Sequence, residues 1–243
     1  MTAHPTAFVD PRATVHESVV LGAGVRVLGA SVVGAGSILG DGVIIGHPAK
    51  QSVVETRSFE GGAGAVVGAN ACIRSGTIVY EGCKVGTDLQ TGHYSVLREH
   101  CVVGDNCALG SHCVLEWRTT LGANARFQNS VTTAENSKIG ANVFLGPHVS
   151  MTGGRYMGSA LVAAGKLSAA EYAEQERAYL ETPVLIHDDV RVGANAVLLA
   201  GSVLEQGCIV AAGAVVGVRV PATYLALGNP ARVMPSAAAG KSG

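Results

Sequence analysis

Side chains that can exchange protons or form hydrogen bonds recur every eighteen residues in the middle of this chain. The positions are Tyr94, His112, Ser130 and His148, and the residues just before them are His93, Ser111, Asn129 and Pro147. A histidine, with a pKa near neutrality, is a natural base for a protonated amine or a tetrahedral intermediate that must lose a proton. Such a set can work together only if eighteen residues return the chain to the same place. The alternative is that these are ordinary solvated turn residues.

A repeat of six residues supplies that return. Hexads run from Val9 to Ile44, from Val67 to Ser150 and from Ile186 to Pro221. The first residue of each hexad is apolar except at Thr91 and Thr133, and the fifth is small or β-branched except at Leu89. An α-helix cannot use this pattern, because steps of six residues spread the apolar positions around its whole surface. Short strands stacked in coils can use it, with three hexads closing one triangular coil.

The fourth position of the hexad predicts the corners of the coil. It is mostly Gly, Asn or Asp, residues that tolerate a positive φ. Between residues 94 and 148 this rule is broken repeatedly, by Tyr94, His100, His112, Arg118, Ser130 and His148. Because a bare coil needs no chemistry at its corners, these exceptions mark a candidate site.

The hexads resemble those of the hexapeptide-repeat acyltransferases, and the resemblance covers most of the chain outside two insertions. It implies an all-β fold, a left-handed parallel β-helix, with the handedness taken from the family because parallel crossovers are otherwise right-handed. We expect one domain over residues 1–235. The segment 228–232, Gly-Asn-Pro-Ala-Arg, resembles the terminal segment of these enzymes. Residues 236–243 are expected to form a disordered tail.

Two breaks in the repeat predict insertions. Residues 46–66 do not fit a multiple of six, and we expect a loop there. Residues 152–185 form a longer insertion, in which Ser168 and Glu171 make a capping box that predicts one short helix over 169–181. We interpret this second insertion as a lid, with a helix that only caps an exposed interface as the alternative.

The cysteines follow the repeat and not a metal-binding or disulfide pattern. Five of the six occupy fifth positions, where other hexads carry Ala, Ser or Thr: Cys83, Cys101, Cys107, Cys113 and Cys208. We expect these to be reduced core residues, with Cys72 on the solvent side. No paired C-x-x-C spacing favours zinc, and we predict no metal.

Composition narrows the function further. The 243 residues carry a formal net charge of −1, so no basic surface for nucleic acid or a membrane is indicated. The sequence has no apolar run of about 18 residues and no signal-peptide pattern. We therefore expect a soluble, cytoplasmic protein that binds neither nucleic acid nor membrane.

The resemblance implies acyl transfer from coenzyme A in clefts between the subunits of a homotrimer. The stretch from Thr91 to Glu99 resembles the T-G-H-x-x-x-x-R-E segment of bacterial sugar N-acyltransferases. The expected reaction moves an acetyl or other short acyl group from acetyl-CoA, or another acyl-CoA, to the amine of an amino sugar, nucleotide-linked in our interpretation. An O-acyltransferase or an amino-acid N-acyltransferase is the close alternative.

Roles for single residues follow from the resemblance and from the eighteen-residue spacing. His93 is the predicted base, His148 is its rival, and Glu99 could orient an imidazole or hold the ammonium. The predicted acceptor-binding residues are Tyr94, His112, Asn129, Ser130, Arg155 and Tyr156. The resemblance places acyl-CoA along the C-terminal coils, against Gly193, Ala211, Gly213, Arg219 and Arg232, with one of the two arginines near phosphates.

This chain departs from the family at one place. The segment 152–157, Thr-Gly-Gly-Arg-Tyr-Met, replaces a T-N-D-x-x-P segment found in many amino-sugar N-acetyltransferases, which indicates an unusual acceptor. Two other classes stay open. A carbonic anhydrase on the same helix would need three converging histidines, for which His93, His112 and His148 are candidates with an unfavourable spacing. A non-catalytic β-helical scaffold is the other.

Overall fold

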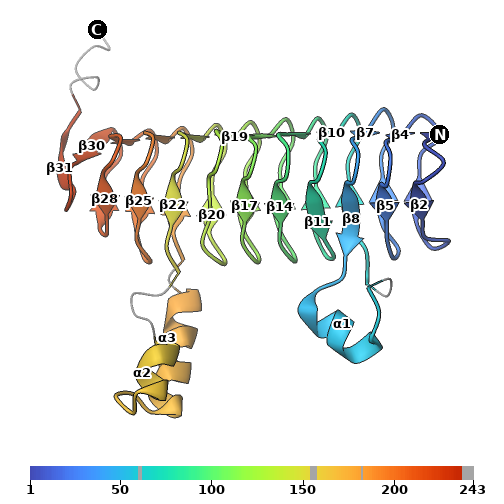
Figure 1. Ribbon diagram of the computed structural model, residues 1–243. Helices are drawn as coiled ribbons and strands as arrows, with labels where there is room; N and C mark the ends of the chain where they lie inside the picture. Colours follow the sequence, from blue (N-terminus) through green and yellow to red (C-terminus); the bar gives the residue numbers. More distant parts are fainter. Residues whose placement is uncertain (60–61, 154–157, 182, 237–243) are drawn as a thin grey trace, which may run out of the picture.

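The computed structural model describes residues 1–59, 62–153, 158–181 and 183–236. The chain winds into a long three-faced coil whose two ends lie at opposite ends of the rod (Figure 1). Each face is a ladder of very short parallel strands, with partners eighteen residues apart along most of the coil, as in the pairing of Gln90 with Ala108. The last coil is two residues shorter, because Leu204 pairs with Val220 and Ile209 pairs with Leu225, so the predicted hexad over 216–221 ends after four residues. The parallel β-helix of hexapeptide repeats that the sequence predicts is confirmed.

Three faces make up the coil. Sheet A contains β1 (Thr2–Ala3), β4 (Val20–Leu21), β7 (Ile38–Leu39), β10 (Cys72–Ile73), β13 (Gln90–Thr91), β16 (Ala108–Leu109), β19 (Arg126–Phe127), β21 (Phe144–Leu145), β24 (Arg191–Val192), β27 (Ile209–Val210), β30 (Tyr224–Leu227) and β31 (Arg232–Pro235). Sheet C contains β3 (Thr14–Val15), β6 (Val32–Val33), β9 (Val66–Val67), β12 (Lys84–Val85), β15 (Val102–Val103), β18 (Thr120–Leu121), β20 (Lys138–Ile139), β23 (Leu185–Ile186), β26 (Val203–Leu204) and β29 (Arg219–Val220).

Sheet B, the remaining face, is divided into two ladders. The first contains β2 (Phe8–Val9), β5 (Arg26–Val27), β8 (Ile44–His47), β11 (Ile78–Tyr80), β14 (Val96–Leu97) and β17 (Val114–Leu115), and the second β22 (Ser150–Met151), β25 (Val197–Leu198) and β28 (Val215–Val216). Single bridges from Thr132 to Val114 and to Ser150 join the two ladders. At the C-terminus β31 turns back antiparallel to β30.

The core is a column of the first and fifth residues of the hexads. Leu97 and Cys101, for example, are fully buried. The two polar exceptions at first positions are also buried, and their hydroxyl groups find partners inside the coil. Thr133 Oγ1 lies 2.8 Å from Thr119 Oγ1, and Thr91 Oγ1 accepts a hydrogen bond from Arg74 N at 3.0 Å. The core therefore tolerates threonine because each hydroxyl is satisfied.

The cysteines behave as predicted within this core. All six are free, the five at fifth positions are buried and Cys72 is half-buried. Four of the buried Sγ atoms donate to backbone carbonyls of the next coil, as Cys113 does to Gln128 O at 3.1 Å; the other three are those of Cys83, Cys101 and Cys107. Burial raises the pKa of Cys208 to about 12 and also raises the pKa of Cys113. The thiols of Cys113 and Cys208 are therefore protonated packing groups.

Both insertions leave the coil after a strand of sheet B and project from the same edge of the rod (Figure 1). The first follows β8 and was expected to be a loop. It contains a helix, α1 (Lys50–Thr56), in which Gln51 Nε2 donates to Glu55 Oε1 at 2.6 Å. The helix forms because a distant carboxylate, Glu81, holds its first residues, an interaction that a local sequence pattern does not reveal.

The second insertion follows β22 and contains two helices where one was expected. These are α2 (Gly158–Ala163) and α3 (Ala169–Glu181), which lie side by side. The bounds of α3 agree with the predicted helix. Its capping box is present, because Glu171 N donates to Ser168 Oγ at 3.2 Å and Ser168 N donates to Glu171 Oε2 at 2.9 Å. Apart from Ser236, the predicted tail lies outside the described residues.

Candidate active site

One corner of the coil carries most of the predicted catalytic residues. We call it the histidine corner: residues 93–94, 111–112, 129–130 and 147–148. Backbone hydrogen bonds join successive coils there. The N–H of the fourth residue of a hexad donates to the carbonyl oxygen of the third residue of the hexad one coil earlier. His112 N donates to His93 O at 2.9 Å, and His148 N donates to Asn129 O at 3.0 Å. The column predicted from the eighteen-residue spacing is therefore present.

Every fourth residue of this corner has a left-handed backbone conformation. The φ angles are 55° at Tyr94, 57° at His112, 61° at Ser130 and 59° at His148. Such angles are unfavourable for bulky side chains, which cost roughly 1–2 kcal/mol more there than glycine does. The chain accepts this cost at a corner where Gly or Asn would serve the fold.

Aromatic rings on the histidine corner pack against one another in solvent. The rings of Tyr94 and His112 are stacked, with centroids 5.7 Å apart and planes 15° apart, and the His93 ring lies 6.3 Å from that of Tyr94. Tyr94 is 60% exposed, and the three histidines of the corner are exposed as well. The imidazoles are thus accessible to a substrate.

A second ladder fixes the third residues of the corner. His93 N donates to Ser111 Oγ at 3.0 Å, and Ser111 N donates to Asn129 Oδ1 at 2.9 Å. The close stacking requires glycine one residue earlier, since a Cβ at Gly92 would lie 2.2 Å from Ser111 N. The Asn129 amide oxygen is therefore engaged, whereas its NH2 group stays available to an acceptor.

Glu99 is not brought to His93. It occupies the next corner of the coil and is 6% exposed. Arg98 Nε donates to Glu99 Oε2 at 2.9 Å, and Arg98 Nη2 donates to Glu99 Oε1 at 3.2 Å. The prediction that Glu99 orients an imidazole is not supported within one chain. His93 and Glu99 are the third residues of two consecutive hexads, and consecutive hexads place their third residues at different corners of the coil.

Three of the five predicted coenzyme residues continue the histidine corner toward the C-terminus. Asn195 N donates to Pro147 O at 2.9 Å, and Gly213 N donates to Ala194 O at 2.8 Å. Gly193, Ala211 and Gly213 therefore lie on the same corner as His148, one and two coils further on. The packing of the coil alone also requires glycine at position 193, because a Cβ there would lie 2.5 Å from Ala212 N.

The two predicted phosphate-binding arginines differ in their surroundings. Arg219 donates through Nε to Glu205 Oε1 at 2.5 Å. A hydrogen bond from Ala222 N and the Arg219 side chain lower the pKa of Glu205, so the carboxylate stays ionised beside the arginine. Arg232 is exposed in β31. The predicted acceptor residues Arg155 and Tyr156 lie outside the described residues.

The sequence analysis missed a group of residues beside α1. His47, Tyr80 and Arg98 meet there on the outer face of sheet B, and the Arg98 guanidinium lies 5.4 Å from the centre of the Tyr80 ring. Beneath them Glu81 accepts hydrogen bonds from Ala49 N at 2.8 Å, from Ala63 N at 2.7 Å and from Ser52 Oγ. The break in the hexads after Ile45 was the only signal of this region.

The described part of the chain contains neither a metal-binding cluster nor a membrane-spanning helix. Within it, no three His, Cys, Asp or Glu side chains of one chain gather closely enough to hold a metal ion. Among the same residues, no helix has the length and apolar character needed to cross a bilayer.

Two segments match family models. Residues 183–217 match the model described as bacterial transferase hexapeptide (six repeats), and residues 101–132 match the hexapeptide repeat of succinyl-transferase. The coil is therefore built from hexapeptide repeats of the type that bacterial transferases carry. The two matched segments together cover less than a third of the chain, so they identify the repeat and not the reaction.

Curated relatives match over a short part of the chain. The 2,3,4,5-tetrahydropyridine-2,6-dicarboxylate N-acetyltransferase of Staphylococcus aureus (strain JH9) is 52% identical over 56 residues. The match covers 23% of this chain and 23% of that relative, so the chain aligns with less than a quarter of the relative's length.

Solved structures match over more of the chain at lower identity. The UDP-N-acetylglucosamine acyltransferase from Campylobacter jejuni is 14% identical, with a TM-score of 0.49, and the match covers 96% of this chain and 74% of that one. The hexapeptide-repeat acetyltransferase VCA0836 from Vibrio cholerae O1 biovar eltor, complexed with acetyl coenzyme A, is 23% identical with a TM-score of 0.40, over 58% of this chain and 70% of that one. Neither likeness carries information on the reaction of this chain.

Proposed function

We propose that this protein is an acyl-CoA-dependent acyltransferase that moves an acetyl or other short acyl group to the amine of a nucleotide-linked amino sugar. The observation that carries the proposal is the continuity of the histidine corner. One edge presents His93, His112 and His148 to solvent, and the same edge continues into Gly193 and Gly213. An acyl-CoA molecule lying along the C-terminal coils would therefore bring its acyl end beside these imidazoles.

The chemistry assigned to this corner is a single group transfer. The acceptor nitrogen bonds to the thioester carbon while the bond from that carbon to sulfur breaks, giving an amide and free coenzyme A. His93 takes the proton that the nitrogen loses, and the departing sulfur receives a proton in turn. His93 is assigned as the base because its imidazole is exposed beside Tyr94 while its backbone is fixed by Ser111.

An amine acceptor has one further support. The Staphylococcus aureus relative, 52% identical over its matched segment, is an N-acetyltransferase. Asn129 would hold a polar group of the acceptor through its NH2, because its oxygen is already bound to Ser111 N. Tyr94, His112 and Ser130 would line the acceptor. We also propose that the working form is a homotrimer with the site between subunits.

The proposal is tested by measuring coenzyme A release from acetyl-CoA with matched acceptors. The panel contains nucleotide-linked amino sugars, the corresponding free amino sugars, amino acids, and nucleotide sugars with a hydroxyl in place of the amine. We expect release and an added acyl mass only with amines, fastest with the nucleotide-linked ones. Faster transfer to a hydroxyl would establish the O-acyltransferase alternative. If no acceptor releases coenzyme A and acetyl-CoA does not raise the melting temperature, the scaffold alternative holds.

A further inference from the structure

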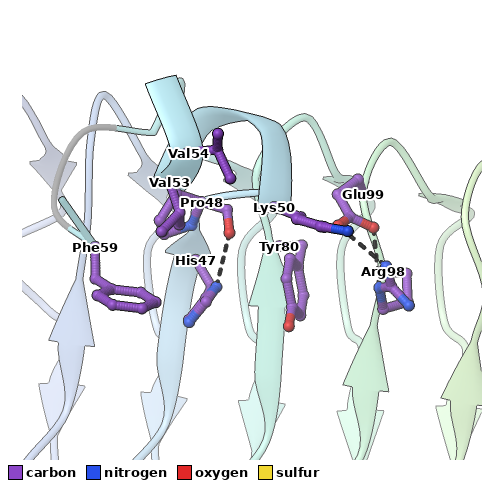
Figure 2. A pocket seen from close by; sticks show the side chains of 9 residues that line it. All are labelled: His47, Pro48, Lys50, Val53, Val54, Phe59, Tyr80, Arg98 and Glu99. Carbon is purple, nitrogen blue, oxygen red and sulfur yellow. Dashed lines mark hydrogen bonds and ion pairs between the residues drawn. The ribbon is translucent and has the colours of Figure 1, made fainter. Parts of the chain in front are cut away.

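A pocket of about 280 Å³ lies where the first insertion folds back on sheet B. We call it the insertion pocket. Its lining comes from the end of β8, from α1 and the residues after it, and from the ends of β11 and β14 (Figure 2): His47, Pro48, Lys50, Val53, Val54, Phe59, Tyr80, Arg98 and Glu99. None of these residues belongs to the histidine corner.

Three rings give the insertion pocket a surface for a planar ligand. The rings of His47 and Tyr80 lie 4.7 Å apart at 49°, and those of His47 and Phe59 lie 6.1 Å apart at 60°. Phe59 is 59% exposed, so much of its ring has no protein partner. Exposed rings grouped in this way are suited to stacking on a heterocyclic base, which contributes about 1–3 kcal/mol per base.

Cations stand beside these rings. Lys50 is exposed and makes no ion pair with any described residue, and Figure 2 shows its ammonium group directed away from Phe59, on the side of Arg98 and Glu99. Arg98 is bound to Glu99 and lies 3.4 Å from Glu116 Oε2, so its charge is already largely balanced. Glu81 also lies beside α1, but its carboxylate is held by Ala49 N, Ala63 N and Ser52 Oγ. Lys50 is therefore the cation in the lining of the pocket that no described carboxylate pairs. This combination favours an anionic group attached to an aromatic ring.

The position of the pocket indicates which molecule would bring such a group. Strand β14 begins two residues after Tyr94 and ends one residue before Arg98, so the histidine corner and the insertion pocket lie at its two ends, about 13 Å apart along an extended strand. A nucleoside diphosphate sugar is an extended molecule with an aromatic base at one end and the sugar at the other. Bound along this face, it would place its sugar at the histidine corner.

We propose that the insertion pocket binds the nucleoside diphosphate of the acceptor, with the base against Phe59, His47 and Tyr80 and the diphosphate beside Lys50. The role of the sugar end rests on the proposed function, whereas binding of a nucleoside diphosphate alone does not. Coenzyme A also contains a nucleoside diphosphate. However, the residues predicted to bind coenzyme A lie on the C-terminal coils, on the other side of His148 from the insertion pocket.

Calorimetric titration of the full chain tests the assignment. UDP, dTDP, GDP and coenzyme A are the probes, each alone and in competition. Phe59→Ala is matched by Phe8→Ala, another exposed phenylalanine on a distant coil, and Lys50→Ala is matched by Lys84→Ala on sheet C. We expect at least one of the three nucleoside diphosphates to bind without displacing coenzyme A. Phe59→Ala and Lys50→Ala should each weaken it about tenfold, while the matched variants leave it unchanged.

Failure of this assignment can be told apart from failure of the proposed function. If no nucleoside diphosphate binds, if coenzyme A displaces it competitively, or if Phe59→Ala and Lys50→Ala have no effect, the assignment is overturned even where acyl transfer to an amine is observed. If binding depends on Phe59 and Lys50 but no acceptor is acylated, the pocket assignment stands and the proposed reaction falls.

Discussion

The rings of Tyr94 and His112 stack with their planes 15° apart, although a full coil of the chain separates the two residues. The stack exists because Tyr94 and His112 both have a left-handed backbone conformation at the same corner of successive coils. The hydrogen bond from His112 N to His93 O joins these two coils at that corner. The fold therefore presents His93 and His112 on one rigid edge, from which their roles can be tested separately.

His93→Asn removes the predicted base without altering the core. We expect kcat to fall about 10²- to 10⁴-fold, the usual contribution of a general base, with little change in melting temperature. The matched variant is His100→Asn, which changes an exposed histidine on the neighbouring corner. Steady-state rates of coenzyme A release compare the two variants. Full turnover by His93→Asn would eliminate His93 as the base.

His148→Asn separates stability from function. His148 has a φ of 59°, a conformation that asparagine tolerates better, so we expect the variant to be more stable by up to about 1 kcal/mol. His100, with a φ of 60°, should show the same gain after the same substitution. Turnover should fall less than tenfold in His148→Asn and stay constant in His100→Asn. A loss of turnover in His148→Asn as large as that expected for His93→Asn would transfer the role of base to His148.

The sequence was sufficient to predict the coil and the shared edge. Period six identifies the buried first and fifth positions, as at Leu97 and Cys101, because the interior of a narrow coil admits only certain sizes at each place. It also predicts that residues eighteen apart share a corner. The left-handed conformation of Tyr94 and His148 follows from the same register, although neither residue type favours it.

The insertions and the insertion pocket could not be predicted in the same way. Helix α1 is held by Glu81, about thirty residues further along the chain, and no repeat records such a contact. The sequence also did not predict that Glu99 would bind Arg98. The neighbouring guanidinium donates to both carboxylate oxygens of Glu99, whereas His93 lies on another corner of the coil. The roles of His93, Asn129 and the coenzyme residues stay predictions, and so does the single domain over residues 1–235.

The buried thiols predict a simple chemical result. Five cysteines are buried in the core, where burial raises the pKa of Cys107, Cys113 and Cys208, and Cys72 is half-buried. A thiol reagent at pH 8 should therefore modify one cysteine per native chain and six after denaturation. Cys72→Ser should abolish the native reaction, and this variant also gives the lowest background in assays of coenzyme A release. Rapid modification of more than one native thiol would contradict the packing of the core.

Glu81 connects the first insertion to the coil and gives it a dependence on pH. Burial alone would raise the pKa of this carboxyl, but hydrogen bonds from Ser52 and from Ala49 N and Ala63 N outweigh it and lower the pKa below its ordinary value of 4.5. Because the folded pKa is lowered, the stabilisation is fully present above the unfolded value. It is lost as the pH falls through the folded value.

Glu81→Gln is expected to release the insertion at neutral pH. The amide replaces one acceptor oxygen with a donor that faces backbone N–H groups, at a cost of about 1–3 kcal/mol. Trypsin should then cleave faster after Arg57, the exposed C-cap residue that follows α1. The matched variant is Glu116→Gln, whose carboxylate accepts a hydrogen bond from Arg98 Nη1 at 3.4 Å and none from the first insertion among the described residues. The difference in melting temperature between the native chain and Glu81→Gln should be constant from pH 6 to 8. It should shrink below about pH 4.5, where Glu81 of the unfolded chain takes up a proton, and be smallest once the pH is below the lowered pKa of the folded chain. A difference that persists unchanged at pH 3 would mean that the charge of Glu81 does not hold the insertion.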